Sequence, residues 1–415
     1  VLVHMACRDR SRASLESVAY GLASEGLTNV LALSGDYPKE GFGGRSRGVF
    51  DIDSVGLTTL LRQVFEQGPR FSIAVAINPF KAIEADLVPQ YLKLDMKVRA
   101  GADVAITQVG YDARSWSELL QWNRAGPGMP LVAAVYVLTK GVARVFNTDV
   151  VPGIRLSDQL KAWVDQAAAD DDKGRARFLD LAAKQVAVAR GMGFNGVYIA
   201  GQRNTVEIDK ILDLAEGYQS DWRALLPDIS YPESGAYRMF ETGDLPQLAS
   251  DRRTRPTRSR RLPVMYRFNR LLHDRVFEPE SKGFEVARTF YRRLESARLG
   301  RPAHVFEQAV KFTMFDCMDC GDCSLPDIAY QCPEGACAKN QRNGPCGGTV
   351  NGECEVPGKP CVWTEAYERL KPFGEAETML EREPVIQDNI LRGTRAWANT
   401  FLGRDHYRHH RGEDP

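Results

Sequence analysis

Cysteine is scarce over most of this 415-residue chain: eight of its nine cysteines lie between residues 317 and 361, and Cys7 stands apart. The start of the chain also lacks a secretory signal pattern, and disulfide frameworks are typical of small secreted domains. These absences disfavour an extracellular, disulfide-stabilised protein. We expect a cytosolic (cytoplasmic) protein whose clustered thiols bind metal. Cys7, which ends a strand-like run, is expected to be an ordinary core residue.

Long apolar runs and net charge are missing as well. No segment approaches the roughly 20 apolar residues that a transmembrane helix needs. The 54 Lys and Arg balance the 54 Asp and Glu, so the whole chain has no electrostatic preference for nucleic acid or an anionic membrane. We therefore expect neither of these as a partner. The length suggests two or three domains, and the 43% hydrophobic residues suffice for a large core.

The first half of the chain alternates strand-like and helical patterns. Nearly continuous apolar runs, typical of parallel strands covered on both faces, occur at 1–7, 29–36, 72–78, 104–109, 131–137 and 196–201. The pattern predicts an α/β fold with a parallel sheet. Six units suffice for a doubly wound sheet, whereas a closed (β/α)8 TIM-type barrel needs eight. The chain opens inside a strand, "VLVHMAC", without an initiator methionine. We therefore expect two N-terminal βα units to lie outside this numbering.

The βα rhythm stops near residue 217, and we predict three parts: a βα barrel at 1–217, a linker at 218–262 and a second domain at 263–415. The linker is rich in Pro, Asp and Arg. Its arginine run is either a docking segment for an acidic partner or a solvated connector, and we favour the connector. Residues 263–312 have helical patterns, the cysteine segment follows, and a tail from about 363 carries one or two helices.

The cysteine spacing indicates metal binding. Three cysteines form C-x2-C-x2-C, and a later Cys-Pro pair follows them, as in ferredoxin-type iron–sulfur ligation. Four thiolates also make a closed zinc site, so zinc remains the competing interpretation. The segment has few large apolar residues, and metal bonds can supply the missing folding free energy. The candidate ligands are Cys317, Cys320, Cys323, Cys332, Cys337, Cys346, Cys354 and Cys361. We expect no disulfides among them and favour a [4Fe–4S] centre.

Polar residues stand at the ends of several expected strands. Asp36 follows "LALSGDYP", Gln108 lies in "AITQVGYD", and His4 is near the end of the first strand. Each of these residues, taken alone, is also explained as a cap of the following helix. Because strand ends meet at one mouth of a βα barrel, three such residues favour a shared site.

These segments resemble a known family. "VHMACRDRSRASL", "NVLALSGDYP", "LKLDMKVRAGADVAITQVGYD" and "GVYIAGQRNT" are similar, in that order, to methylenetetrahydrofolate reductase. The resemblance implies a (β/α)8 barrel that holds a flavin, usually FAD, and aligns from the family's third strand onward. "CGDC", "NGPCGG" and "CVWTEAYERLK" resemble the C-terminal module fused to some bacterial members. A stand-alone form of that module is a partner subunit in acetogens.

The resemblance also implies residue roles. Asp36 matches the aspartate beside the flavin N1 edge and the folate, and Gln108 matches the glutamine that hydrogen-bonds the pterin. His4 and Lys97 match positions near the flavin, Lys97 at its phosphates. Arg203 matches an arginine after the last strand, near the substrate.

Two positions depart from the family pattern. The family's Arg-Gly-Asp is Ser34-Gly35-Asp36 here, and an aromatic residue after the third aligned strand is Asn78. Both positions touch the flavin environment, so the choice between FAD and FMN stays open. The family's catalytic glutamate lies on the first strand, which this numbering lacks.

The resemblance implies reversible hydride transfer between reduced flavin and the one-carbon unit of 5,10-methylenetetrahydrofolate, giving 5-methyltetrahydrofolate. An iron–sulfur module would relay electrons from a protein donor, whereas a zinc module would be structural and NAD(P)H would reduce the flavin directly. The alternative is a non-catalytic scaffold or electron-transfer subunit of a larger complex. A homo-oligomer is compatible with either.

Overall fold

A parallel sheet forms the centre of the protein, for which a computed structural model describes residues 1–64, 70–148, 150–296 and 300–411. Within these residues its six strands are β1 (Val3–Ala6), β2 (Asn29–Leu33), β5 (Ser72–Ile77), β6 (Val104–Thr107), β7 (Leu131–Tyr136) and β8 (Gly196–Ala200). They lie in chain order, each parallel to the next. This order is that of a βα barrel, since a doubly wound sheet reverses its order.

The sheet is open on one side. Within the described residues β1 and β8 are its two edges and do not pair with each other. Six strands with an open side were predicted, and the structure confirms this. A small antiparallel hairpin, β3 (Glu40–Gly41) and β4 (Gly44–Arg45), lies between β2 and the next helix.

Helices separate the strands, and several begin at a polar capping residue. They are α1 (Arg12–Ser24), α2 (Ser54–Gln63), α3 (Glu84–Arg99), α4 (Ala113–Ala125), α5 (Lys140–Phe146), α6 (Asp158–Ala167), α7 (Arg175–Met192) and α8 (Thr205–Tyr218). Ser11, Asp53 and Asp112 accept hydrogen bonds from backbone N–H groups in the first turns of α1, α2 and α4. Such caps satisfy donors that the helix leaves unpaired.

The strands and these helices share one hydrophobic core. Val30, Ile73 and Val75 have no exposed surface, as expected for strands covered on both faces. Cys7 is also fully buried in this cluster. The prediction that it is a core residue is confirmed.

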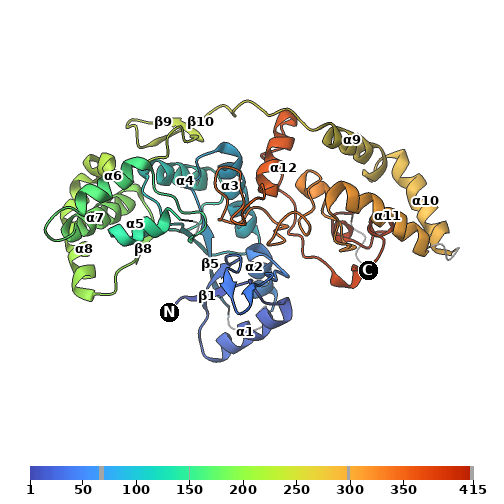
Figure 1. The fold of residues 1–415 in the computed structure, drawn as a ribbon, viewed down its shortest axis with the longest axis horizontal. Helices are drawn as coiled ribbons and strands as arrows, with labels where there is room; N and C mark the ends of the chain where they lie inside the picture. Colours follow the sequence, from blue (N-terminus) through green and yellow to red (C-terminus); the bar gives the residue numbers. More distant parts are fainter. Residues whose placement is uncertain (65–69, 149, 297–299, 412–415) are drawn as a thin grey trace.

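The stretch predicted as a linker is partly ordered. It begins with helical turns at Gln219–Ile229 and continues as an antiparallel hairpin, β9 (Phe240–Thr242) and β10 (Ala249–Arg253). The buried Arg114 of α4 donates to the carbonyl oxygens of Phe240 (2.8 Å) and Glu241 (2.9 Å) and pairs with Glu118. Residues 254–263 then cross to the second half of the molecule without regular secondary structure (Figure 1). The boundaries at 217 and 262 stay predictions.

The remaining chain is helical around a cysteine-rich segment. It contains α9 (Val264–Leu272), a π-helical turn (His273–Phe277), α10 (Lys282–Ser296), α11 (Gly300–Phe315), α12 (Val362–Leu370), α13 (Ala396–Phe401) and a final turn, His406–Arg411. The predicted helical stretch at 263–312 and the helices in the tail are confirmed. Across the described ranges, every helix is too short or too polar to cross a membrane.

The cysteine-rich half packs directly on the sheet domain. Helix α12 lies against α3, and Trp363 and Tyr367 of α12 belong to the same hydrophobic core as the strands. At the start of α3 the buried Glu84 accepts hydrogen bonds from Tyr367 Oη (2.8 Å) and Lys371 Nζ (2.6 Å). Figure 1 shows α12 standing beside α3, with α9, α10 and α11 at the far end from α5–α8.

Candidate active site and thiol clusters

A cavity of about 250 Å³ lies at the carboxyl ends of β2, β5 and β6. Asp36, Asn78 and Gln108, which follow these neighbouring strands, all line it. Lys97 of α3 lines it too. Asp36 and Gln108 thus lie at one mouth, whereas His4, which was expected beside them, lies outside its described lining. The chemical roles of all three stay predictions.

The turn that presents Asp36 depends on glycine. Gly35 has φ +83, and a Cβ there would lie 2.9 Å from Arg8 Cβ and 3.3 Å from Ala6 Cβ. A side chain at this position would collide with the end of β1 as well as strain the backbone. The glycine in the Ser-Gly-Asp sequence therefore allows the turn that places the carboxylate of Asp36 at the cavity.

Three buried lysines line the cavity. Lys93, Lys97 and Lys339 line it, and each side chain is almost fully buried. Lys97 Nζ donates to the carbonyl oxygen of Ala76 (2.6 Å), and burial together with nearby Lys93 lowers the pKa of Lys97 to about 7. An anionic ligand would favour the charged form of this lysine.

The cysteine-rich half forms the opposite wall of the cavity, through the segment 339–349. Side chains of the sheet domain donate to the backbone of this segment. Gln90 binds the carbonyl oxygen of Cys346 (2.8 Å), Lys93 that of Gly344 (3.0 Å), and Lys81 that of Gly347 (2.8 Å). The mouth of the sheet domain is therefore built for this segment.

A buried ionic contact supports the same interface. Asp53 and Lys93 lie 3.6 Å apart with side chains 1% and 2% exposed. Asn343 of the segment donates its backbone N–H to Asp53 Oδ2 (3.1 Å). Burial alone would raise the pKa of Asp53, but the charge of Lys93 and the hydrogen bonds from Gly56 and Asn343 hold it below its usual value.

The other predicted site residues are placed differently. Ser34 Oγ donates to Gln341 Oε1 (3.1 Å), and Asn78 Nδ2 donates to the carbonyl oxygens of Gly153 (3.0 Å) and Gly347 (3.4 Å). Both side chains line the cavity but are engaged by protein groups. His4 and Arg203 are exposed and lie outside its described lining. Their roles stay predictions.

Sequence reasoning missed the polar face of α3, although a signal was present. Asp86, Gln90, Lys93 and Lys97 follow one another at spacings of four, three and four residues, so they share one helix face. All four are at most 8% exposed. A polar stripe of this kind on a helix flanked by buried strands indicates a polar partner surface.

The eight clustered cysteines fall into two sets of four. The thiols of Cys323 and Cys332 both interact electrostatically with the thiol of Cys320, and that of Cys332 also interacts with Cys317. We name Cys317, Cys320, Cys323 and Cys332 the distal set. The thiols of Cys337, Cys354 and Cys361 all interact electrostatically with the thiol of Cys346. We name these four the proximal set, because Cys346 lines the cavity.

All nine cysteines are free thiols, which agrees with the expectation of no disulfides. Burial raises the pKa of Cys323 and of Cys337 to about 12. Without metal these thiols are therefore neutral at pH 7, and a metal centre would have to displace their protons.

Buried cations accompany both sets. Lys311 and Arg342, each at most 4% exposed, lie near the distal thiols, which raise the pKa of both groups against the effect of burial. Lys81 and Lys339 lie near Cys346 of the proximal set. Burying a cation is costly unless an anion compensates it, and three of these cations have a carboxylate partner: Glu307 for Lys311, Glu334 for Arg342 and Glu355 for Lys339. The cations therefore do not by themselves require charged thiolates.

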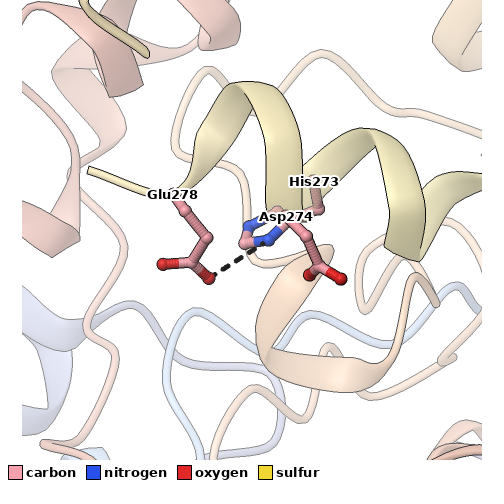
Figure 2. Close-up of side chains that lie close together, drawn as sticks. All are labelled: His273, Asp274 and Glu278. Atoms are coloured by element: carbon pink, nitrogen blue, oxygen red, sulfur yellow. Dashed lines mark ion pairs between the residues drawn. The ribbon is translucent and has the colours of Figure 1, made fainter. Parts of the chain in front are cut away.

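A different trio of possible ligands lies on the π-helical turn. Among the described residues, His273, Asp274 and Glu278 are the one group of three ligand atoms within 4.8 Å of one another. Figure 2 shows the imidazole of His273 directed toward Glu278, with Nδ1 3.4 Å from Oε1. Asp274 and Glu278 are exposed, and acidic groups often gather at surfaces without an ion, so the trio carries no site assignment.

Two family models match this chain, one in each half. The family model described as "Methylenetetrahydrofolate reductase" matches residues 1–215. The chain belongs to the methylenetetrahydrofolate reductase family. A second model, "Methylene-tetrahydrofolate reductase C terminal", matches residues 297–389, which include all eight clustered cysteines. The resemblance noted for both halves of the sequence is thus confirmed.

Curated relatives of this family match a limited stretch. The 5,10-methylenetetrahydrofolate reductase of Pectobacterium carotovorum subsp. carotovorum is 35% identical over 118 residues, and that of Escherichia coli (strain K12) is 33% identical over 118. Each match covers 27% of this chain and 35% of the relative. The chain thus spans about a third of the length of the curated relatives it matches.

One solved structure gives a weak, partial match. It is an uncharacterized protein from Clostridium thermocellum that binds two copies of 5-methyl-5,6,7,8-tetrahydrofolic acid. The likeness has a TM-score of 0.35 at 12% identity and covers 53% of this chain and 72% of that one.

Proposed function

We propose that this protein is a flavin-dependent oxidoreductase that interconverts 5,10-methylenetetrahydrofolate and 5-methyltetrahydrofolate. The observation that carries the proposal is the cavity at the strand ends, where Asp36 and Gln108 come together in a chain of this family. A cytosolic location stays a prediction.

The polar groups of the cavity suit the folate chemistry. Methylenetetrahydrofolate must open to a 5-iminium cation before a hydride reaches it. The carboxylate of Asp36 would stabilise this developing charge, and such electrostatic stabilisation is often the largest catalytic contribution. Gln108 would orient the pterin through hydrogen bonds. The acid that protonates N10 during ring opening is not assigned to any residue of this chain.

Of the three lysines that line the cavity, Lys93 is paired with Asp53 and Lys339 with Glu355. Lys97 is therefore the lysine that would bind a flavin phosphate, whether the cofactor is FAD or FMN. When bound, the flavin supplies the hydride. The 250 Å³ cavity is smaller than a typical ligand pocket of about 300–1,000 Å³. A second cavity of about 600 Å³ at the ends of β7 and β8, bordered by Val137 and Gln202, offers further room on the same edge of the sheet.

The sequence spacing of the cysteines, C-x2-C-x2-C followed by a Cys-Pro pair, favours iron–sulfur ligation over zinc. A [4Fe–4S] cluster in each set would be able to transfer single electrons, whereas a tetrahedral zinc ion would bind four thiolates at about 2.3 Å from each sulfur. With zinc instead, the module would be structural and NAD(P)H would be the reductant.

The test is an anaerobic assay of the intact protein with 5,10-methylenetetrahydrofolate. Reduced methyl viologen, NADH and NADPH are offered separately, and 5-methyltetrahydrofolate is measured by mass spectrometry. We expect product with reduced viologen and bound flavin in the visible spectrum. Folate binding without product from any of the three reductants would contradict the proposal and favour the scaffold alternative.

A further inference from the structure

The turn that carries Asp36 is held from outside the sheet domain. Gly35, just before Asp36, accepts a hydrogen bond at its carbonyl oxygen from Lys339 Nζ (2.8 Å). Tyr37, just after Asp36, donates its backbone N–H to Glu355 Oε1 (2.6 Å). Lys339 and Glu355 both belong to the cysteine-rich half, so this half holds the backbone on either side of Asp36.

Lys339 and Glu355 also bind each other. Lys339 Nζ donates to Glu355 Oε2 at 2.7 Å, and the two side chains are 4% and 3% exposed. Glu355 thus uses one carboxylate oxygen for the lysine and the other for the backbone of the turn. Buried polar networks whose members have their partners are rigid. We call this pair the clamp.

The clamp holds the backbone of the turn and leaves the side chain of Asp36 accessible. Asp36 is exposed and lines the cavity. Glu355 compensates the charge of Lys339, and both of these side chains are buried. The clamp therefore acts on the backbone around Asp36, while the carboxylate itself can meet a ligand in the cavity.

The hydrogen bonds that the sheet domain itself makes to this turn are longer. Across the described ranges they run from Arg8 Nη1 to the carbonyl oxygen of Asp36 (3.4 Å) and from the Ser54 N–H to Ser34 Oγ (3.2 Å). Ser34 in turn donates to Gln341, again in the cysteine-rich half (3.1 Å). Because hydrogen bonds weaken with length, the turn depends more on the cysteine-rich half than on its own domain for its position.

We propose that Lys339 and Glu355 are positioning residues for the chemistry at Asp36. The inference rests on the proposed function, in which the carboxylate of Asp36 stabilises the iminium cation. Such stabilisation requires a charge that is already in place, and a misplacement of about 1 Å can cost on the order of a hundredfold in rate. By holding the residues before and after Asp36, the clamp keeps the carboxylate where the positive charge develops.

A purely structural role, joining the two halves of the chain, is the competing explanation. The structure supplies a matched control, because a second buried pair joins the same halves. Lys371, which follows α12, and Glu84 of α3 lie 2.6 Å apart, and their side chains are 5% and 3% exposed. In the described structure neither residue hydrogen-bonds to the turn at 34–37. If the clamp were only structural, removing either pair should have the same effect.

The experiment removes both charges of one pair at a time in the intact protein. K339M/E355Q removes the lysine that holds the turn together with the charge of its partner, and K371M/E84Q does the same to the control pair. Both members are replaced because a single substitution would leave a buried charge without its partner. Turnover of 5,10-methylenetetrahydrofolate is measured with reduced methyl viologen, NADH and NADPH to obtain kcat and KM. Both double variants are also made in the D36N background.

We expect K339M/E355Q to lower kcat by on the order of tenfold, with KM and bound flavin little changed. In the D36N background the same substitutions should lower kcat no further, because a positioning residue acts only through the carboxylate. K371M/E84Q should keep the wild-type kcat. Unchanged kcat in K339M/E355Q, or an equal fall in the D36N background, would overturn the proposal and leave the proposed function standing.

E355Q alone is the milder variant if K339M/E355Q proves too unstable to purify. It keeps the shape of the side chain and an oxygen for the Tyr37 N–H, so its fall in kcat should be smaller. That fall should likewise vanish in the D36N background. A fall of the same size in that background would contradict the positioning role.

Hydrogen exchange, followed by mass spectrometry, measures the turn without depending on turnover. We expect the amides of residues 34–37 to exchange faster in K339M/E355Q than in wild type, and at the wild-type rate in K371M/E84Q. Equal exchange in all three proteins would overturn the proposal. Absence of product with every reductant in wild type would defeat the proposed function itself, and the exchange result would still decide whether the clamp holds the turn.

Discussion

Ser34 and Asn78, two positions where the resemblance implies other residues, both contact the cysteine-rich half. Ser34 donates to Gln341, and Asn78 donates to the carbonyl oxygens of Gly153 and Gly347. Gln341 and Gly347 belong to the segment that closes the cavity, so these two side chains help to hold that segment in place.

Asp36 is the residue on which the proposed chemistry depends most. D36N keeps the shape of the side chain but removes the charge that would stabilise the iminium cation. We expect folate turnover to fall on the order of a hundredfold, with flavin content and thermal unfolding unchanged. D209N, at an exposed position on α8, is the control. Turnover of D36N within a factor of two of wild type would remove Asp36 from the mechanism.

His406 fastens the end of the chain to the cysteine-rich half. Its Nδ1 lies 2.5 Å from Asp322 Oδ1 and its Nε2 3.0 Å from Asp327 Oδ2. Burial alone would lower its pKa, but the two carboxylates raise it to about 9 from 6.5. Because the folded-state pKa is the higher one, the contact stabilises fully below pH 6.5, and its contribution is lost as the pH rises through 9.

The upward shift of the pKa of His406 determines how a substitution at this position should depend on pH. H406Q should lower the free energy of unfolding by on the order of 3 kcal/mol at pH 6 and by much less at pH 9.5, as measured in urea. H304Q is the control, because His304 has the single carboxylate partner Asp319 at 3.0 Å. A deficit of H406Q that is equal at both pH values would show that the charge on His406 does not matter.

At the scale of elements, the strands were predictable because each is buried on both faces and reads as a continuous apolar run. The run at 131–137 became β7 (Leu131–Tyr136), and that at 72–78 became β5 (Ser72–Ile77). The linker was less predictable, since the hairpin β9–β10 is held by Arg114, more than 120 residues earlier in the chain. Such a long-range contact cannot be predicted from the local sequence.

The segment 339–349 fits its place through close packing of a glycine. A Cβ on Gly348 would lie 2.0 Å from Glu355 Oε2, which pairs with Lys339 at 2.7 Å. G348A should therefore destabilise the protein by about 1–3 kcal/mol through overpacking and release metal from the proximal set. Urea unfolding and metal analysis measure both effects.

The control for this substitution is G217A in α8, where a Cβ would meet nothing within 4 Å. Alanine is favoured over glycine in a helix by about 0.5–1 kcal/mol, so G217A should be neutral or stabilising. If G348A proves as stable and as metal-rich as G217A, the close fit of the segment is not important for the fold.

For the whole molecule, the sequence predicted two domains joined by a linker, but not that the two domains together form one cavity. The cysteine spacing indicated metal, and the strand ends indicated Asp36 and Gln108. That Lys339, Cys346 and Gly347 complete the same cavity rests on contacts between residues some 250–300 positions apart, which no periodicity encodes. The burial of Lys93 could not be predicted either, because its partners Asp53 and Gln341 come from different halves of the chain.

The central proposal is that eight thiolates hold two redox centres near the cavity at the carboxyl ends of β2, β5 and β6, and elemental analysis of anaerobically purified protein tests it most directly. The account predicts about eight iron and eight sulfide per chain, a spectrum containing flavin and iron–sulfur absorption, and loss of about half the iron in C346S. Two zinc ions per chain, each bound to four sulfurs at about 2.3 Å, without iron or sulfide, would contradict it.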